Sequence, residues 1–121
     1  LWREWSPDWS GYKEFSKNTI KVLSEDGVLN KALAYYRSTL QPTSPVPELN
    51  AEQLERRDQK ISLPSLYLHG INDGCIGSDL VDGMEEGFED LTVRILDDCG
   101  HFLHLEKPDE VNKIISEFLS S

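Results

Sequence analysis

Two short stretches of the chain decide its predicted fold: Leu66–Asp73 (LYLHGIND) and Ile95–Phe102 (ILDDCGHF). Each is an apolar run that stops near a glycine and is followed by a titratable side chain. In a parallel α/β sheet the strands are buried, and the loops at their carboxyl ends carry the functional groups. We therefore predict an α/β fold in which two buried strands present their C-terminal loops at one working edge.

Hydrophobic periodicity predicts the elements around these loops. We expect strands over Ile61–Gly70 and Leu91–Leu96, and helices over Gly77–Phe88 and Pro108–Leu119. The side chains expected on the buried faces of the two helices are Leu80, Val81, Met84 and Phe88 in the first, and Val111, Ile114, Ile115, Phe118 and Leu119 in the second. The alternation of strand and helix predicts parallel strands joined by a right-handed crossover.

The first forty residues are predicted to be helical. Aromatic residues recur at helical spacing near the start, at Trp2, Trp5, Trp9, Tyr12 and Phe15. Within this run Ser6 is expected to cap a new helix, with Pro7 in its first turn. We interpret the rings as packing residues, with the alternative that some line an apolar pocket. A second helix is predicted over Ser24–Leu40, with Tyr36 on its apolar stripe.

A proline-rich stretch divides the chain into two predicted parts. Gln41–Asn50 contains Pro42, Pro45 and Pro47, which is typical of a linker. The highly charged residues 51–60 are expected to form a short exposed helix or a loop. We therefore predict a helical part with its linker over residues 1–60, and an α/β part over residues 61–121.

Composition excludes several classes of function. The chain has 121 residues, enough for one small domain, and a formal net charge of −10. A surface this acidic repels phosphate backbones and anionic lipids. We therefore expect no nucleic-acid or membrane partner. No apolar run approaches the length of about 18 residues that a spanning helix needs. Two cysteines, Cys75 and Cys99, without metal-ligand spacing favour free thiols and a reducing, cytoplasmic setting.

Two parallel strands do not form a stable sheet by themselves, since about three strands with cover on both faces are generally needed. We therefore expect the chain to be a piece of a longer protein. Its exposed strand edges and apolar faces also predict self-association of the isolated chain.

The two loops and the residues after them resemble the C-terminal end of the α/β-hydrolase fold. The resemblance rests on Leu66–Asp73 and on the run from Asp97 to Val111, which contains the pair Gly100-His101. It extends back to Ala34-Tyr35-Tyr36-Arg37, which looks like the end of the helical cap in epoxide hydrolases. The resemblance implies that residues 1–60 are a cap remnant with a linker, and that residues 61–121 are the last strands and helices of the core.

The resemblance also implies roles for three residues. The turn Gly70-Ile71-Asn72-Asp73 matches the family's Gly-x-x-Asp turn, so Asp73 is the candidate catalytic acid. His101 matches the catalytic base, and a histidine is suited to this role because its ordinary pKa of about 6.5 lets it exchange protons near neutrality. Tyr36 matches the cap tyrosine that binds the oxygen of the opening epoxide ring.

Other titratable residues near the two loops compete for these roles. Asp97 and Asp98 are alternative orienting carboxylates, although solvated loop charges are the favoured interpretation. Asp79 suits a helix N-terminus with no catalytic part. His69 and His104 are interpreted as structural residues, or at most as residues that support the site residues from outside. Glu106 is expected to hold the second loop by accepting backbone N–H groups.

The nucleophile elbow is missing from the 121 residues, because neither Gly-x-Ser-x-Gly nor its aspartate counterpart occurs. We therefore expect the C-terminal part of an epoxide hydrolase-like enzyme that works through a covalent intermediate and is inactive alone. A serine esterase of the same fold is the first alternative, and a non-catalytic binding module is the second. The expected partners are an apolar small-molecule substrate and the remaining N-terminal part of the hydrolase; no metal or organic cofactor is implied.

Overall fold

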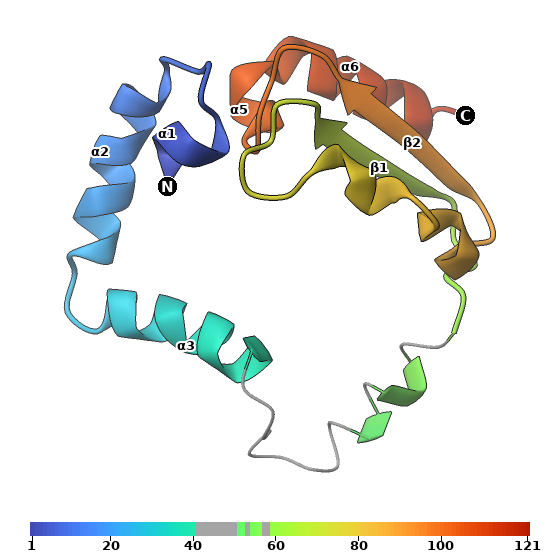
Figure 1. Cartoon of the computed structure of the whole chain (residues 1–121), viewed down its shortest axis with the longest axis horizontal. Helices are drawn as coiled ribbons and strands as arrows, with labels where there is room; N and C mark the ends of the chain where they lie inside the picture. The colour runs from blue at the N-terminus through green and yellow to red at the C-terminus, as the bar shows by residue number, and fades with distance from the viewer. Residues whose placement is uncertain (41–50, 53, 57–58) are drawn as a thin grey trace. The chain divides into compact units, whose positions relative to one another are not determined.

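The computed structural model describes residues 1–40, 51–52, 54–56 and 59–121 (Figure 1). The chain forms two compact units. The first joins Leu1–Tyr12 to Lys60–Ser121, and the second comprises Lys13–Gln59. The first twelve residues therefore group with the sheet and not with the helices that follow them, which differs from the division at residue 60 drawn from the sequence. The interpretation of residues 1–60 as a cap remnant stays a prediction.

The sheet of the first unit has two parallel strands, as predicted. β1 (Ser65–Gly70) pairs with β2 (Leu91–Leu96) in a register that places Leu68 opposite Arg94 and Gly70 opposite Leu96. β1 is shorter than the predicted strand. Ile61 forms only an isolated parallel bridge with Phe88, and Pro64, which has no N–H to donate to a ladder, precedes β1 directly.

The helix predicted over Gly77–Phe88 is wrong. The crossover between the strands contains two short 3-10 helices, η1 (Ser78–Val81) and η2 (Met84–Gly87). Gly83 lies between them at φ +80, in the left-handed region that ends a right-handed helix. Three glycines within eleven residues also lower helix propensity by about 1 kcal/mol each. Leu80, expected on the buried face, is 51% exposed.

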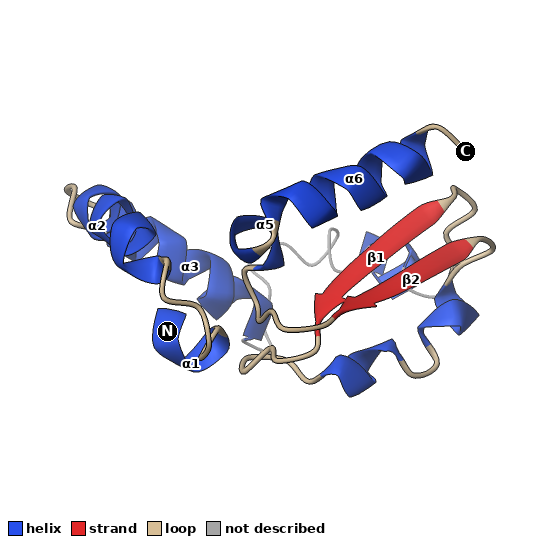
Figure 2. Cartoon of the chain, turned by 90° about the horizontal axis from the view of Figure 1, so that it is seen from above, coloured by secondary structure: helices blue, strands red, loops and turns tan. Residues whose placement is uncertain are grey.

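The core of the first unit lies between the sheet and α6 (Pro108–Leu119), whose bounds are those predicted. Figure 2 shows α6 along one face of the sheet, with η1 and η2 on the opposite side. Pro108 begins the helix and acidic residues occupy its first turn, where they complement the helix dipole. The buried core consists of Leu96, Cys99 and Val111. Three partly buried residues pack against it, namely Leu68, Leu103 and Ile114.

The start of the chain differs from its prediction. α1 (Trp2–Trp5) is a short helix, and α2 (Tyr12–Leu23) begins eleven residues into the chain. Ser6 does not cap a helix. Its hydroxyl is fully buried and donates to Glu106 Oε1 at 2.7 Å. A long-range carboxylate has therefore taken the serine oxygen that local capping would have used.

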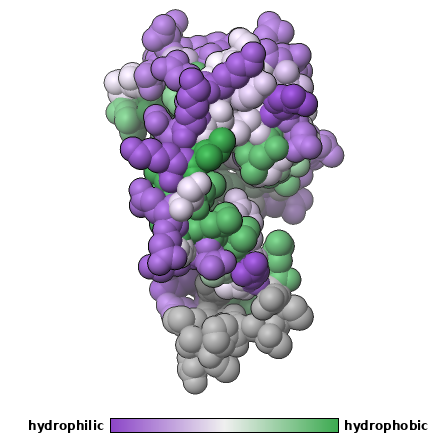
Figure 3. Space-filling view, turned by 90° about the vertical axis from the view of Figure 1, so that its left-hand side faces the viewer, coloured by the Kyte–Doolittle hydropathy of each residue, from purple (hydrophilic) through white to green (hydrophobic). Residues whose placement is uncertain are grey.

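The second unit contains most of α2 and all of α3 (Val28–Leu40), which is shorter than the predicted Ser24–Leu40 helix because Gly27 at φ +74 precedes it. None of residues 13–38 is buried. Apolar side chains of this unit are exposed, including Leu29 at 48% and Tyr36 at 59%. Figure 3 shows apolar surface between hydrophilic groups on the side of the molecule that faces left in Figure 1.

Several remaining predictions concern features other than the sheet. Residues 51–52 and 54–56 are helical and exposed, as expected for the charged stretch, whereas the predicted linker Gln41–Asn50 lies outside the described residues. Cys75 and Cys99 are free thiols, as predicted. Within the described part of the chain, every helix is too short or too polar to cross a bilayer. The cytoplasmic setting stays a prediction.

Candidate active site

The loop after β1, here called the acid loop (Gly70–Ile76), holds the Asp73 carboxylate in one position. Asp73 Oδ1 accepts the N–H groups of Cys75 at 2.7 Å and Ile76 at 3.0 Å. The N–H of Asp73 itself donates to the carbonyl of Gly70 at 3.1 Å. A short carboxylate that accepts N–H groups two or three residues further on stabilises a tight turn. The Asp73 side chain is only 6% exposed, so its second oxygen points into the protein.

The loop after β2, here called the base loop (Leu96–Phe102), is held by Glu106, as predicted. The Glu106 carboxylate accepts the N–H of Gly100 at 2.9 Å and that of Phe102 at 3.0 Å. It also accepts the Ser6 hydroxyl. Glu106 lies in α5 (Leu103–Glu106), a single helical turn that follows directly. One side chain from the following turn therefore fixes the backbone on both sides of His101.

The two loops bring Asp73 and His101 together at the carboxyl ends of neighbouring strands. The distance from His101 Nδ1 to Asp73 Oδ2 is 2.8 Å. An ionised carboxylate only accepts hydrogen bonds, so Nδ1 carries the proton and Nε2 of the neutral ring is left as a proton acceptor. No described residue forms a hydrogen bond with Nε2, and the His101 side chain is 28% exposed. A histidine held in this way by a buried carboxylate has the geometry that a general base requires.

Electrostatics keep the Asp73 carboxylate ionised. Burial is the largest single effect on the pKa of Asp73 and acts to raise it, because a charge is costly away from water. The N–H groups of Ile76 and Cys75 and the neighbouring His101 ring act in the opposite direction and together prevail. The pKa of Asp73 is therefore lowered from its ordinary value. An anion at this place can stabilise the imidazolium that forms when His101 takes up a proton.

The first helical turn of the chain, α1, contacts both loops, although the sequence did not associate it with the site. The carbonyl of Trp5 accepts the N–H of His101 at 3.0 Å and the N–H of Gly74 at 3.1 Å. The backbone passes so close that a Cβ at Gly74 would lie 1.9 Å from the Glu4 carbonyl oxygen. Glycine at this position is therefore a packing requirement, and it is the sequence feature that could have indicated a close backbone approach.

The rings of Trp2, Trp5 and Trp9 pack beside His101 and Phe102. The ring centroids of Trp5 and His101 lie 4.7 Å apart, and the angle between the two ring planes is 68°. Phe102 follows His101 and its ring lies 4.2 Å from that of Trp2 and 6.5 Å from that of Trp9. The rings pack on one another and Trp5 borders the His101 ring, which agrees with the packing interpretation; the alternative that some of them line an apolar pocket stays a prediction.

The competing residues are not in the pair. Asp97 and Asp98 are exposed, and Asp98 has a left-handed backbone with φ 49. His104 and Asp79 are exposed as well. His69 is buried, and its Nε2 lies 3.8 Å from Asp73 Oδ2, the oxygen that pairs with His101. Tyr36 belongs to the second unit, and its part in substrate binding stays a prediction.

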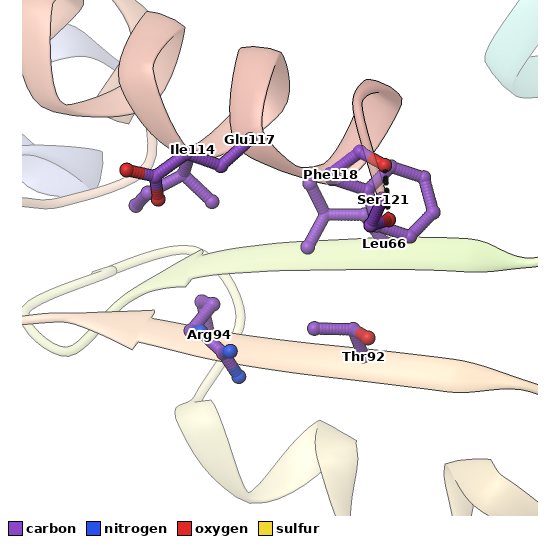
Figure 4. A pocket seen from close by; sticks show the side chains of 7 residues that line it. All are labelled: Leu66, Thr92, Arg94, Ile114, Glu117, Phe118 and Ser121. Carbon is purple, nitrogen blue, oxygen red and sulfur yellow. Dashed lines mark hydrogen bonds between the residues drawn. The ribbon is translucent and has the colours of Figure 1, made fainter.

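A cavity of about 260 Å³ lies elsewhere in the first unit, between α6 and the sheet (Figure 4). Its walls combine apolar and charged groups: Leu66, Thr92, Arg94, Ile114, Glu117, Phe118 and Ser121. None of these residues comes from the acid or base loop. Across the described residues, no three His, Cys, Asp or Glu side chains meet as metal ligands would.

Comparison with known proteins agrees with the resemblance described from the sequence. No family model matches the chain. Over 76 residues it is 28% identical to human monoacylglycerol lipase ABHD6, covering 63% of this chain and 23% of the relative. Over 63 residues it is 32% identical to mouse bifunctional epoxide hydrolase 2, covering 52% of this chain and 11% of the relative. The chain therefore spans about a quarter or less of these relatives.

Solved structures give the same fold. The M145A mutant of an epoxide hydrolase from Bacillus megaterium matches with a TM-score of 0.51 and 28% identity, over 53% of this chain and 22% of that one. Cfl2 from Burkholderia cenocepacia matches with a TM-score of 0.64 over 81% of this chain and 31% of that one; at 24% identity this match concerns the fold alone. The chain is thus similar to α/β-hydrolase-fold enzymes, and its parallel strands with flanking helices correspond to the C-terminal portion of that fold.

Proposed function

We propose that Asp73 and His101 are the acid and base of an epoxide hydrolase-like α/β-hydrolase that works through a covalent intermediate. The observation that carries the proposal is the 2.8 Å hydrogen bond from His101 Nδ1 to Asp73 Oδ2, made between two strand-end loops. His101 Nε2 takes a proton from water, and the water oxygen bonds to the carbonyl carbon of the intermediate. The proton then returns to the departing group, while Asp73 stabilises the imidazolium.

The attacking group in this proposal comes from another segment of the hydrolase, since the 121 residues contain no nucleophile elbow. Two features support such a partner. The sheet has two strands in the described residues, fewer than a stable sheet generally needs. The apolar side chains of α3 are exposed, with Leu33 at 39% and Leu40 at 79%. The remaining N-terminal part of the enzyme is the proposed occupant of both surfaces, and this chain alone is proposed to be inactive.

Epoxides are the favoured substrates, with Tyr36 donating a hydrogen bond to the oxygen of the opening ring. The similarity to an epoxide hydrolase in both sequence and structure supports this class. Apolar esters are the second candidate, favoured by the similarity to monoacylglycerol lipase ABHD6. In that case a serine would attack, and His101 would deprotonate it before activating water.

The variant His101→Ala in the assembled hydrolase separates these mechanisms. With an aspartate nucleophile, alkylation does not require His101, so an epoxide should leave a stable alkyl-enzyme adduct that intact-mass spectrometry detects. With a serine nucleophile, neither step proceeds and no adduct accumulates. In both cases turnover should fall by about a thousandfold or more.

Matched variants test the other roles. Asp73→Asn should also lower turnover strongly, whereas His104→Gln, which changes an exposed histidine, should leave it unchanged. Tyr36→Phe should slow epoxide opening about tenfold to a hundredfold and leave ester hydrolysis unaffected. Turnover of both substrates that survives His101→Ala unchanged would refute the proposal. Binding of either substrate without turnover in the assembled wild-type protein would identify a non-catalytic module instead.

A further inference from the structure

His69 is a buried histidine for which the proposed chemistry has no use. It lies in β1 with 4% of its surface exposed. By the alternation of strand residues it belongs to the sheet face opposite α6, the side on which η1 and η2 run (Figure 2). Burying an imidazole is costly unless both ring nitrogens find partners. Both do: Nδ1 lies 2.8 Å from the Tyr67 hydroxyl, and Nε2 lies 3.1 Å from the carbonyl oxygen of Ile76.

These two partners select one form of the ring. A carbonyl oxygen can only accept, so Nε2 of His69 must carry the proton that it donates to Ile76. In the neutral ring Nδ1 is then an acceptor, and the Tyr67 hydroxyl donates to it. The geometry thus specifies a proton on Nε2 of His69, with Tyr67 as the group that satisfies the other nitrogen.

These contacts connect His69 to Asp73 through the backbone of Ile76. Ile76 is held at both backbone groups, because its carbonyl accepts from His69 and its N–H donates to Asp73 Oδ1 at 3.0 Å. The acid loop is therefore anchored to its own strand at the point where it orients Asp73. His69 Nε2 lies 3.8 Å from Asp73 Oδ2, too far for a hydrogen bond. His101 is therefore the ring that pairs with this oxygen, at 2.8 Å.

We infer that His69, together with Tyr67, is a positioning residue that anchors the acid loop through Ile76 and holds Asp73 Oδ2 toward His101. Hydrogen bonds link Tyr67 to His69, His69 to the Ile76 carbonyl, the Ile76 N–H to Asp73, and Asp73 to His101. The catalytic meaning of this inference rests on the proposed function, but the positioning itself can be measured without any substrate.

The test is nuclear magnetic resonance of the protein labelled with 15N in its three histidines. The nitrogen chemical shifts of His69 report its tautomer, and the hydrogen-bonded Nδ1 proton of His101 reports the contact with Asp73. We expect His69 as the Nε2-protonated tautomer. In His69→Leu, which fills the space but pairs with nothing, the His101 Nδ1 proton should exchange with water about tenfold faster or more.

A conservative variant separates positioning from packing. In His69→Gln an amide N–H can donate to Ile76 while the amide oxygen accepts from Tyr67, so exchange of the His101 proton should return to within about threefold of wild type. Tyr67→Phe removes one hydroxyl with little loss of volume and leaves Nδ1 of His69 without its partner, while the Ile76 carbonyl still selects the Nε2-protonated ring, so the weakened anchor should make the His101 Nδ1 proton exchange faster than in wild type. This variant keeps the inference testable if His69→Leu does not fold.

The outcomes are distinguishable from failure of the proposed function. Asp73→Asn should abolish the slowly exchanging His101 proton; if it does not, the acid–base pair itself is wrong. If Asp73→Asn has its effect, an unchanged His101 proton in folded His69→Leu refutes only the positioning role. A His69 without a proton on Nε2 in wild type, or an unchanged His101 proton in folded Tyr67→Phe, would likewise overturn the inference.

Discussion

The acid loop and the base loop end neighbouring strands of one sheet, yet they hold their side chains in different ways. Asp73 is fixed by N–H groups of its own loop, and its side chain is 6% exposed. His101 is 28% exposed, and the base loop depends on groups from outside it, namely the Glu106 carboxylate and the Trp5 carbonyl. The Asp73 side chain is therefore held within its own loop, whereas the base loop is held by the turn that follows it and by the Trp5 carbonyl, which also accepts the N–H of Gly74.

This difference suits the proposed roles. The acid has to keep one orientation and remain ionised, for which short-range N–H donors in a buried turn are effective. The base has to keep one nitrogen accessible to water and substrate while the other stays paired. Substitutions that act on one loop and not on the other test the comparison.

The largest expected effect is at the point where the start of the chain passes the acid loop. In Gly74→Ala the new Cβ would lie 1.9 Å from the Glu4 carbonyl oxygen, so backbone must move. We expect destabilisation of about 2–3 kcal/mol in urea unfolding. Gly87→Ala is the matched control, because its Cβ would meet nothing within 4 Å, and it should change stability by less than about 1 kcal/mol. Equal midpoints for both variants would contradict the close approach.

The next effect concerns the support of the base loop. Glu106→Ala removes the acceptor of the Gly100 and Phe102 N–H groups, which should cost about 2 kcal/mol and speed hydrogen exchange at both amides. Exchange at Cys75 and Ile76 in the acid loop should change less. Glu117→Ala, which removes an exposed carboxylate 3.8 Å from Lys113, should cost less than about 0.5 kcal/mol. A loss confined to neither loop would contradict the division between them.

A smaller effect is expected in the dependence of stability on pH. Since the pKa of folded Asp73 is lowered, the unfolded chain binds more protons between the folded and unfolded pKa values. The stabilisation is complete above the unfolded pKa of about 3.9 and is lost as the pH falls through the folded value. Asp73→Asn, whose amide oxygen can still accept from the turn, should lose less stability on acidification. Parallel urea midpoints of wild type and variant across this range would contradict the assignment.

The smallest effect is expected for the acid that neighbours His101 in sequence. Asp97→Asn should change stability by less than about 0.5 kcal/mol, because the side chain is exposed. Turnover of the assembled hydrolase should be unchanged as well. A strong loss of turnover would instead make Asp97 the orienting carboxylate in place of Asp73.

Much of the sheet unit could be predicted from the sequence. The apolar runs of β1 and β2 and the amphipathic pattern of α6 reflect burial on faces with a fixed period, which a single segment displays. The pairing of Asp73 with His101 was implied by the resemblance, and the structure places the two residues in contact. The crossover could not be predicted, because the apolar spacing of Leu80, Val81 and Met84 fits a helix that Gly83 interrupts.

The sequence by itself determined the two strand-end loops, since glycine, the acidic turn and the apolar runs act over a few neighbouring residues. Only the tertiary structure decided which distant groups contact these loops. The Ser6 hydroxyl donates to Glu106 instead of capping a helix. The Trp5 carbonyl accepts from both Gly74 and His101, and His69 pairs with the Ile76 carbonyl of the acid loop. These contacts depend on which distant groups meet in space, and the physical requirement that buried polar groups be paired then selects among them.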